Sequence, residues 1–182
     1  IVQPSTPANY FHMLRTQAYK RPRKPLIAFT PKQLLRLSAA SSHLDEFTSG
    51  GFQPVIGDDT ITDPSSVTRV LLCSGRLYYD LVKEREHRTD TSTAIIRLEQ
   101  LYPLPEAEVA EALAQYPNAS VTWVQDEPRN QGAWPHLALN LFPSLGHPVR
   151  VVSRPESATT AAGRASLHKE QAATLIAQAF EG

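Results

Sequence analysis

The apolar residues of this chain fall into short continuous runs that are separated by segments with helical spacing. The runs predict buried strands, and they lie at 67–73, 94–98, 121–124 and 149–152. Between and after them, apolar residues recur every three or four positions, which predicts helices near 77–85, 105–116, 134–141 and 164–180. Strands that alternate with helices predict an α/β fold with a largely parallel sheet that helices cover on both faces.

The start of the chain predicts a strand end at residues 1–2 and then a helix. Pro7 follows Ser5 and Thr6, which can cap a helix, and proline in the first turn costs no helical hydrogen bond. We expect this helix to bury one apolar face, formed by Tyr10, Phe11, Leu14 and Ala18.

A basic segment with two prolines follows this helix and predicts a domain boundary near Lys24. We therefore divide the chain into residues 1–24 and residues 25–182. A short buried strand is expected at 26–30. Residues 31–66 are irregular and long for a loop, so we expect them to be functional or packed against a neighbour.

The composition gives few hints of function. Eighteen basic residues balance 18 acidic ones, so net charge attracts neither nucleic acid nor an acidic membrane. No apolar stretch approaches the roughly 20 residues that span a bilayer. The single cysteine, Cys73, permits no internal disulfide and fits a reducing, cytoplasmic location. Because no methionine begins the chain, we expect it to start inside a longer protein.

The motifs of self-contained catalysis are missing from the sequence. No glycine-rich dinucleotide fingerprint or phosphate loop is present, and the six histidines never reach metal-ligand spacing. We expect Cys73 to be an inert core thiol and the acidic turn at 57–59 to be a solvated loop rather than a metal site. Residues 74–76 follow a strand and open a helix, where they either bind an anion or cap that helix.

Charged and amide residues gather where two predicted strands end. Glu99, Asp126 and Glu127 could serve in acid–base chemistry if paired and desolvated, or form ion pairs between domains. Trp134 is either an interface anchor or part of its own core. The sequence favours contacts with another domain or a second subunit, through Arg97, Glu99, Glu127, Asn130, Gln131 and Trp134.

The basic segment at the predicted domain boundary has two interpretations. Its guanidinium groups could bind the phosphates of an acyl-nucleotide, or the segment could be a solvated linker held extended by its prolines. The candidates for such an effector site are Arg15, Arg21, Arg23 and Lys24, with Lys20 beside them.

Four stretches together resemble one known family. They are PSTPANYFHMLR at 4–15, TPKQLLR at 30–36, RLEQLYP at 97–103 and DEPRNQGAW at 126–134. This combination resembles the C-terminal part of the thiamin-diphosphate-dependent decarboxylase component of 2-oxoglutarate dehydrogenase, a transketolase-like family. Weaker support comes from GFQPVIG at 51–57 and CSGRLYYD at 73–80.

The resemblance implies that residues 1–24 end a pyrimidine-binding domain and that residues 25–182 form a transketolase-like C-terminal domain. Thiamine diphosphate and Mg²⁺ would be bound by upstream domains, so this segment would contain no catalytic residue and be inactive alone. The parent enzyme would decarboxylate 2-oxoglutarate in the citric acid cycle as a homodimer. Its further partners would be a lipoyl-bearing acyltransferase and, as an allosteric activator, acetyl-CoA.

Two other functions remain open from the sequence. The chain could be a non-catalytic docking or effector-sensing module. It could also be the equivalent domain of another 2-oxo acid dehydrogenase, although the runs at 99–103 and 130–134 resemble those enzymes less well.

Overall fold

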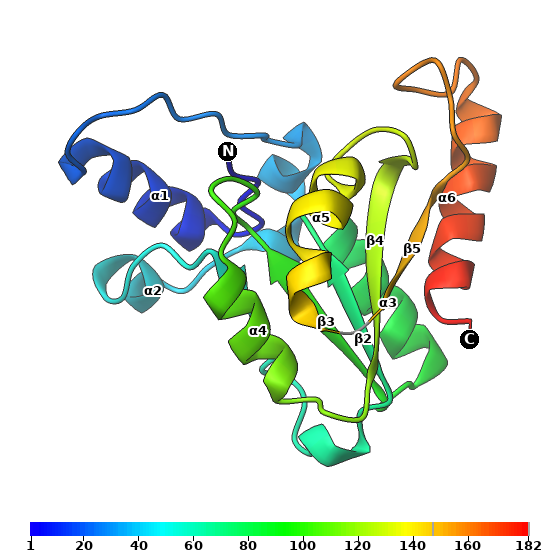
Figure 1. Cartoon of the computed structure of the whole chain (residues 1–182). Helices are drawn as coiled ribbons and strands as arrows, with labels where there is room; N and C mark the ends of the chain where they lie inside the picture. Colours follow the sequence, from blue (N-terminus) through cyan, green and yellow to red (C-terminus); the bar gives the residue numbers. More distant parts are fainter. Residues whose placement is uncertain (147, 182) are drawn as a thin grey trace.

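The computed structural model describes residues 1–146 and 148–181, and one mixed sheet lies at its centre (Figure 1). Within these residues the sheet has five strands in the order β1-β3-β2-β4-β5. All neighbouring strands are parallel except β1, which pairs antiparallel with β3 at one edge. The strands are β1 (Val55–Ile56), β2 (Arg69–Cys73), β3 (Thr93–Leu98), β4 (Ser120–Pro128) and β5 (Val149–Arg154).

Helices cover both faces of the sheet, as the sequence predicts. One face packs against α4 (Glu106–Ala114) and α5 (Trp134–Asn140). The other face packs against α3 (Leu77–Arg88) and α6 (Ala165–Ala179). Two further helices, α1 (Pro7–Tyr19) and α2 (Leu44–Thr48), lie together at the side of the sheet away from α6 (Figure 1). Short 3₁₀ turns occur at Lys32–Arg36, Ser38–Ala40, Pro64–Ser66 and Phe142–Leu145.

The two faces of each central strand feed two separate apolar clusters. In β2, Leu72 points into the cluster under α4 and α5, whereas Leu71 points into the cluster under α3 and α6. Successive strand side chains point to opposite faces, so strands buried on both sides must be apolar throughout. The prediction of an inert Cys73 is confirmed, because the thiol is buried and burial raises its pKa to about 12.

The prediction of a helix after Pro7 is confirmed, but the predicted buried face was wrong. Thr6 caps α1 by accepting a hydrogen bond from the Asn9 amide at 3.2 Å. The buried residues are Ala8, Asn9, His12 and Met13, whereas Phe11 and Leu14 are 42% and 49% exposed. Asn9 and His12 are tolerated inside because the surrounding protein offers them hydrogen-bond partners.

Two further predictions for the first 66 residues need correction. The expected buried strand at 26–30 is wrong, because only Ala28 forms an isolated bridge, with Val2, and the flanking Ile27 and Phe29 are exposed. The antiparallel strand β1 was not predicted, since two residues are too short for a recognisable alternation. The irregularity expected for 31–66 is otherwise observed.

Two leucines of α5 provide a test of this packing. Leu137 is fully buried, so Leu137→Ala leaves a cavity and should lower the free energy of unfolding by about 2–5 kcal/mol. Leu139 lies on the same helix but is 78% exposed, so Leu139→Ala should change it by less than about 0.5 kcal/mol. Urea denaturation of both variants measures the difference. Equal effects would show that α5 does not pack as described.

Candidate functional site

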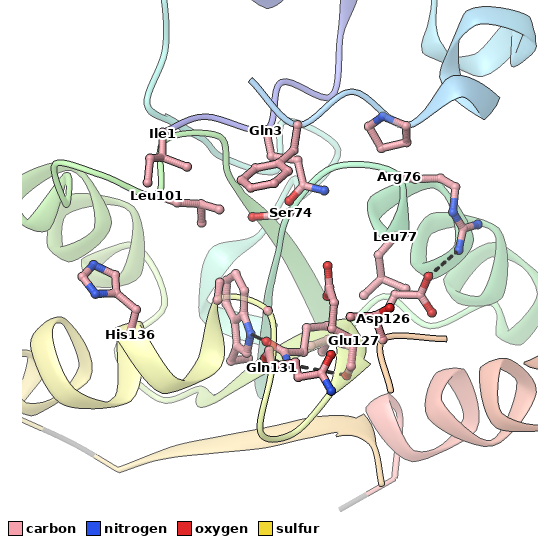
Figure 2. A pocket seen from close by; sticks show the side chains of 18 of the residues that line it. Ile1, Gln3, Ser74, Arg76, Leu77, Leu101, Asp126, Glu127, Gln131 and His136 are labelled. Atoms are coloured by element: carbon pink, nitrogen blue, oxygen red, sulfur yellow. Dashed lines mark hydrogen bonds and ion pairs between the residues drawn. The ribbon is translucent and has the colours of Figure 1, made fainter. Parts of the chain in front are cut away.

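A cavity of about 680 Å³ opens where β2, β3 and β4 end (Figure 2). Five lining residues come from the carboxyl ends of these strands. Ser74 and Leu77 follow β2, Leu101 follows β3, and Asp126 and Glu127 lie at the end of β4. The opposite wall comes from Ile1 and Gln3 of the N-terminal segment, and His136 of α5 lies to one side. The volume lies within the range of small-molecule sites in proteins.

The sheet topology explains why the cavity lies here. From β2 the chain crosses through α3 to β3 on one face, and from β4 it crosses through α5 to β5 on the other face. The connections therefore cover opposite faces and diverge between β2 and β4. A crevice at the carboxyl ends of such strands is the usual ligand position in open α/β sheets.

Gln125 shapes the loop that follows β4. Its buried side chain accepts hydrogen bonds from Trp123 Nε1 at 3.0 Å and from the Trp134 amide at 2.8 Å. It donates to the carbonyl oxygens of Pro128 at 3.0 Å and Gln131 at 2.7 Å. One amide thus satisfies both ends of the loop. Sequence reasoning missed Gln125, although one polar residue at the end of an apolar strand run could have revealed it.

Glycine is required at Gly132 in the cavity wall and at Gly75 in the loop after β2. Gly132 has φ +68°, and a Cβ there would lie 2.9 Å from Glu127 Cβ. Gly75 has φ +61°, and a Cβ there would lie 2.6 Å from the Gln3 amide nitrogen. At both positions the left-handed backbone strains any residue that has a Cβ, and at Gly132 the Cβ would also press on the Cβ of Glu127. The loops after β2 and β4 therefore depend on glycine at these two positions.

The charges at the cavity rim are mostly paired. Arg76 contacts Asp80, and its Nη2 lies 3.3 Å from Asp126 Oδ2. Arg154 donates to the Asp126 carbonyl oxygen and lies 3.8 Å from its carboxylate. The capping hypothesis for residues 74–76 was wrong, because Ser74 instead donates to the Leu98 carbonyl oxygen at 2.6 Å.

Glu127 differs from its neighbour Asp126. Within the described residues, no ion pair joins its carboxylate to a cation. Burial raises the pKa of Glu127, since a desolvated carboxylate holds its proton more tightly. Asp126 and Glu127 are adjacent in sequence but do not form an acid–base pair, because the Asp126 carboxylate forms ion pairs with Arg76 and Arg154.

Glu99 and Arg97 lie outside the cavity and hold the N-terminal segment. Glu99 Oε2 accepts hydrogen bonds from the Ser5 amide at 2.7 Å and Asn9 Nδ2 at 2.9 Å. Arg97 donates to Ser5 Oγ at 3.2 Å and lies 4.1 Å over the Tyr78 ring. The two parts into which we divide the chain therefore meet at these residues. Their role toward another domain or subunit stays a prediction.

Asn130, Gln131 and Trp134 make contacts within their own domain. Asn130 and Gln131 donate to the Ser157 carbonyl oxygen at 3.0 and 2.8 Å, so they hold the loop between β5 and α6. Trp134 is half-buried, with its ring centroid 5.7 Å from that of Phe142. Trp134 thus belongs in part to its own core, and an additional interface role stays a prediction.

The basic segment surrounds the end of α1. Arg15 donates to the Gly50 carbonyl oxygen at 2.6 Å, and Arg21 and Arg23 donate to the Ala18 carbonyl oxygen at 3.2 and 3.3 Å. Unpaired carbonyls at a helix end attract cations. Lys24 is exposed beside them. The structure thus brings Arg21 and Arg23 together at the end of α1, whereas Arg15 contacts Gly50, and effector binding stays a prediction.

The acidic turn at 57–59 is not the solvated loop that we expected. The Asp58 side chain is buried, forms an ion pair with Arg85 and accepts a hydrogen bond from the Ile95 amide at 2.7 Å. Arg85 also donates to the Thr93 carbonyl oxygen at 3.1 Å.

In the part of the chain that the structure describes, no group of three or more acidic, histidine or cysteine side chains could hold a metal ion. No helix of that part could span a membrane.

The doubly covered sheet and the crevice at its carboxyl edge define an α/β domain with a preformed cavity. Residues 41–180 match the model of the family described as 2-oxoglutarate dehydrogenase C-terminal. The chain therefore belongs to this family, in agreement with the resemblance seen in its sequence.

Curated proteins support this membership along nearly the whole chain. The 2-oxoglutarate dehydrogenase E1 component of Cupriavidus necator is 45% identical over 99% of the chain. The E1/E2 component of Corynebacterium glutamicum is 46% identical over 100%, and the multifunctional 2-oxoglutarate metabolism enzyme of Mycobacterium sp. (strain JLS) is 41% identical over 99%. The chain spans only 19%, 15% and 15% of these proteins.

A pH series tests the environment of Glu99. Burial raises its pKa above the ordinary 4.5, so the folded state holds this proton more tightly than the unfolded state. As pH rises from 4.5 through the folded pKa, ionising Glu99 should lower the free energy of unfolding. Glu99→Gln cannot titrate and should lack this part of the pH dependence. Urea denaturation across this pH range measures the free energy of unfolding of the wild-type protein and of Glu99→Gln. Identical pH profiles for the two proteins would contradict the raised pKa.

Proposed function

We propose that this chain is the C-terminal structural and regulatory part of a thiamin-diphosphate-dependent 2-oxoglutarate dehydrogenase or decarboxylase of the citric acid cycle. The observation that carries the proposal is identity of 45–46% to E1 and E1/E2 components over almost every residue of the chain. The decarboxylation itself, the homodimer and the lipoyl-bearing acyltransferase partner belong to the longer protein. So does the cytoplasmic location.

The described residues do not fit a Mg²⁺–diphosphate group. Such a site needs several oxygen ligands around one metal ion. Asp58 and Asp126 are paired with arginines. Among the described residues, this leaves Glu127 as the one carboxylate of the cavity lining without an ion pair, and one carboxylate is too few to hold the metal ion. We therefore assign thiamine diphosphate and Mg²⁺ to other parts of the longer protein, and we assign no catalytic residue here.

The surface of residues 1–44 supports contact with those other parts. Most of the large apolar side chains that are exposed in the described structure lie there, namely Ile1, Phe11, Leu14, Tyr19, Ile27, Phe29, Leu35, Leu37 and Leu44. Concentrated exposed apolar side chains typically mark a protein interface. We define these nine residues as the N-terminal apolar surface and propose that it packs against the rest of the longer protein.

Two exposed leucines test this surface in the longer protein. Leu35 is 87% exposed, so Leu35→Asp leaves this domain's own core intact and should damage only a contact made in the assembled enzyme. We expect the rate of 2-oxoglutarate decarboxylation to fall at least about tenfold, because burying an unpaired charge in an interface costs several kcal/mol. Release of CO₂ from 2-oxoglutarate and from pyruvate measures the rate and the substrate preference.

Leu139→Asp is the matched control, since Leu139 is 78% exposed on α5 and lies outside the N-terminal apolar surface. It should decarboxylate 2-oxoglutarate at the wild-type rate. Equal rates for the two variants would argue against the interface, and a preference for pyruvate in the parent protein would argue against the proposed substrate.

The basic group around the end of α1 is our candidate for acetyl-CoA binding. The double variant Arg21→Ala with Arg23→Ala should lower the ratio of decarboxylation rates with and without acetyl-CoA, because these exposed guanidinium groups would bind its phosphates. We expect the ratio to fall by about fivefold or more, as typical coupling energies are 1–3 kcal/mol. Steady-state assays measure this ratio.

A second pair of exposed cations serves as the control for charge alone. Lys83 and Lys169 lie on α3 and α6, away from the basic group, so their double alanine variant should keep the wild-type ratio. An unchanged ratio in the arginine variant would remove the effector site from this segment.

A further inference from the structure

The cavity at the carboxyl edge is shaped by elements from across the chain. The N-terminal segment, the ends of β2, β3 and β4, and α5 all contribute to its wall. Gly132 leaves no room for a side chain at one point of this wall. Such a wall is specified by many residues at once, which distinguishes it from an incidental gap between loops.

The side chains that line the cavity do not suit an anionic ligand. Arg76 is the single lysine or arginine among the lining residues, and it is already bound to Asp80 and Asp126. Counted over side chains alone, the two carboxylates of the lining, Asp126 and Glu127, leave it with an excess of one negative charge over Arg76 when His136 is neutral. A phosphate-bearing effector would meet repulsion here, whereas the basic group at the end of α1 would attract it.

The remaining lining favours a flat apolar body with a polar head. Leu77, Leu101, Trp123 and Ala133 supply apolar surface. Glu127 lies across the cavity from Ile1 and Gln3 in Figure 2. Ligand sites commonly combine an apolar lining with a few polar groups that fix the orientation of the ligand.

We propose that this cavity binds a small cationic ligand, a protonated amine or amidine on a planar apolar body, with its cationic head against Glu127. A planar amidinium matches a carboxylate through two parallel hydrogen bonds. Burial raises the pKa of Glu127, and a cationic partner offsets the cost of keeping its carboxylate ionised.

Three isosteric probes test the charge preference in the longer protein that contains this chain. Benzamidine, benzamide and benzoate share one ring and differ in the charge of the head group. Saturation-transfer NMR titrations should rank them benzamidine, benzamide, benzoate, with benzamidine bound about tenfold more tightly than benzamide. Equal affinities, tighter binding of benzoate, or no saturable binding of benzamidine at millimolar concentration would overturn the proposal.

Two variants test whether the preference for a cationic head group arises at Glu127. Glu127→Gln should remove the tenfold advantage of benzamidine over benzamide, because only the charge of the head-group partner changes. Glu111→Gln is the matched control, since Glu111 is exposed on α4 and does not line the cavity. A preference that survives Glu127→Gln, or that is lost in Glu111→Gln, would overturn the assignment.

A filled cavity provides a second test that does not depend on the charge. Leu101→Trp adds an aromatic ring to a residue that lines the cavity and should abolish saturable benzamidine binding. Circular dichroism confirms that the variant folds. Undiminished binding in the folded variant would place the benzamidine site elsewhere and overturn the proposal.

Discussion

The buried carboxylate of Glu99 joins the first helix to the sheet. One oxygen accepts hydrogen bonds from the Ser5 amide and the Asn9 side chain, directly after β3. This contact fixes the path of the N-terminal segment, which supplies Ile1 and Gln3 to the cavity wall. A buried carboxyl group is costly unless it is hydrogen-bonded, so the two bonds to its Oε2 favour this one arrangement of the segment. The cavity and the N-terminal apolar surface both depend on it.

The central sheet and its four covering helices could be predicted from the sequence, because strands buried on both faces need continuous apolar runs. The first 66 residues could not be predicted as well. The buried face of α1 contains Asn9 and His12, whose partners lie 34 or more residues away, so no local pattern reveals them. The expected strand at 26–30 failed for a related reason, since Ala28 pairs only with Val2.

The candidate site was predicted in position more than in detail. Polar residues after β3 and β4 indicated the carboxyl edge, where the cavity lies. Their roles depend on neighbours that spacing does not show. Asp126 is held by arginines from two other elements, whereas the adjacent Glu127 lies without an ion pair in the described structure. Asn130 and Gln131, expected to contact another domain, hold the loop before α6.

The ion pair between Asp58 and Arg85 also provides hydrogen-bond partners for backbone groups at the outer edge of the sheet. Strand β1 covers β3 only beside Arg97 and Leu98. Farther along the same edge, Asp58 accepts the Ile95 amide proton and Arg85 donates to the Thr93 carbonyl. Two side chains thus occupy backbone groups that another strand would otherwise pair with. An open strand edge invites association between molecules, and this arrangement leaves fewer free backbone groups on β3 for such pairing.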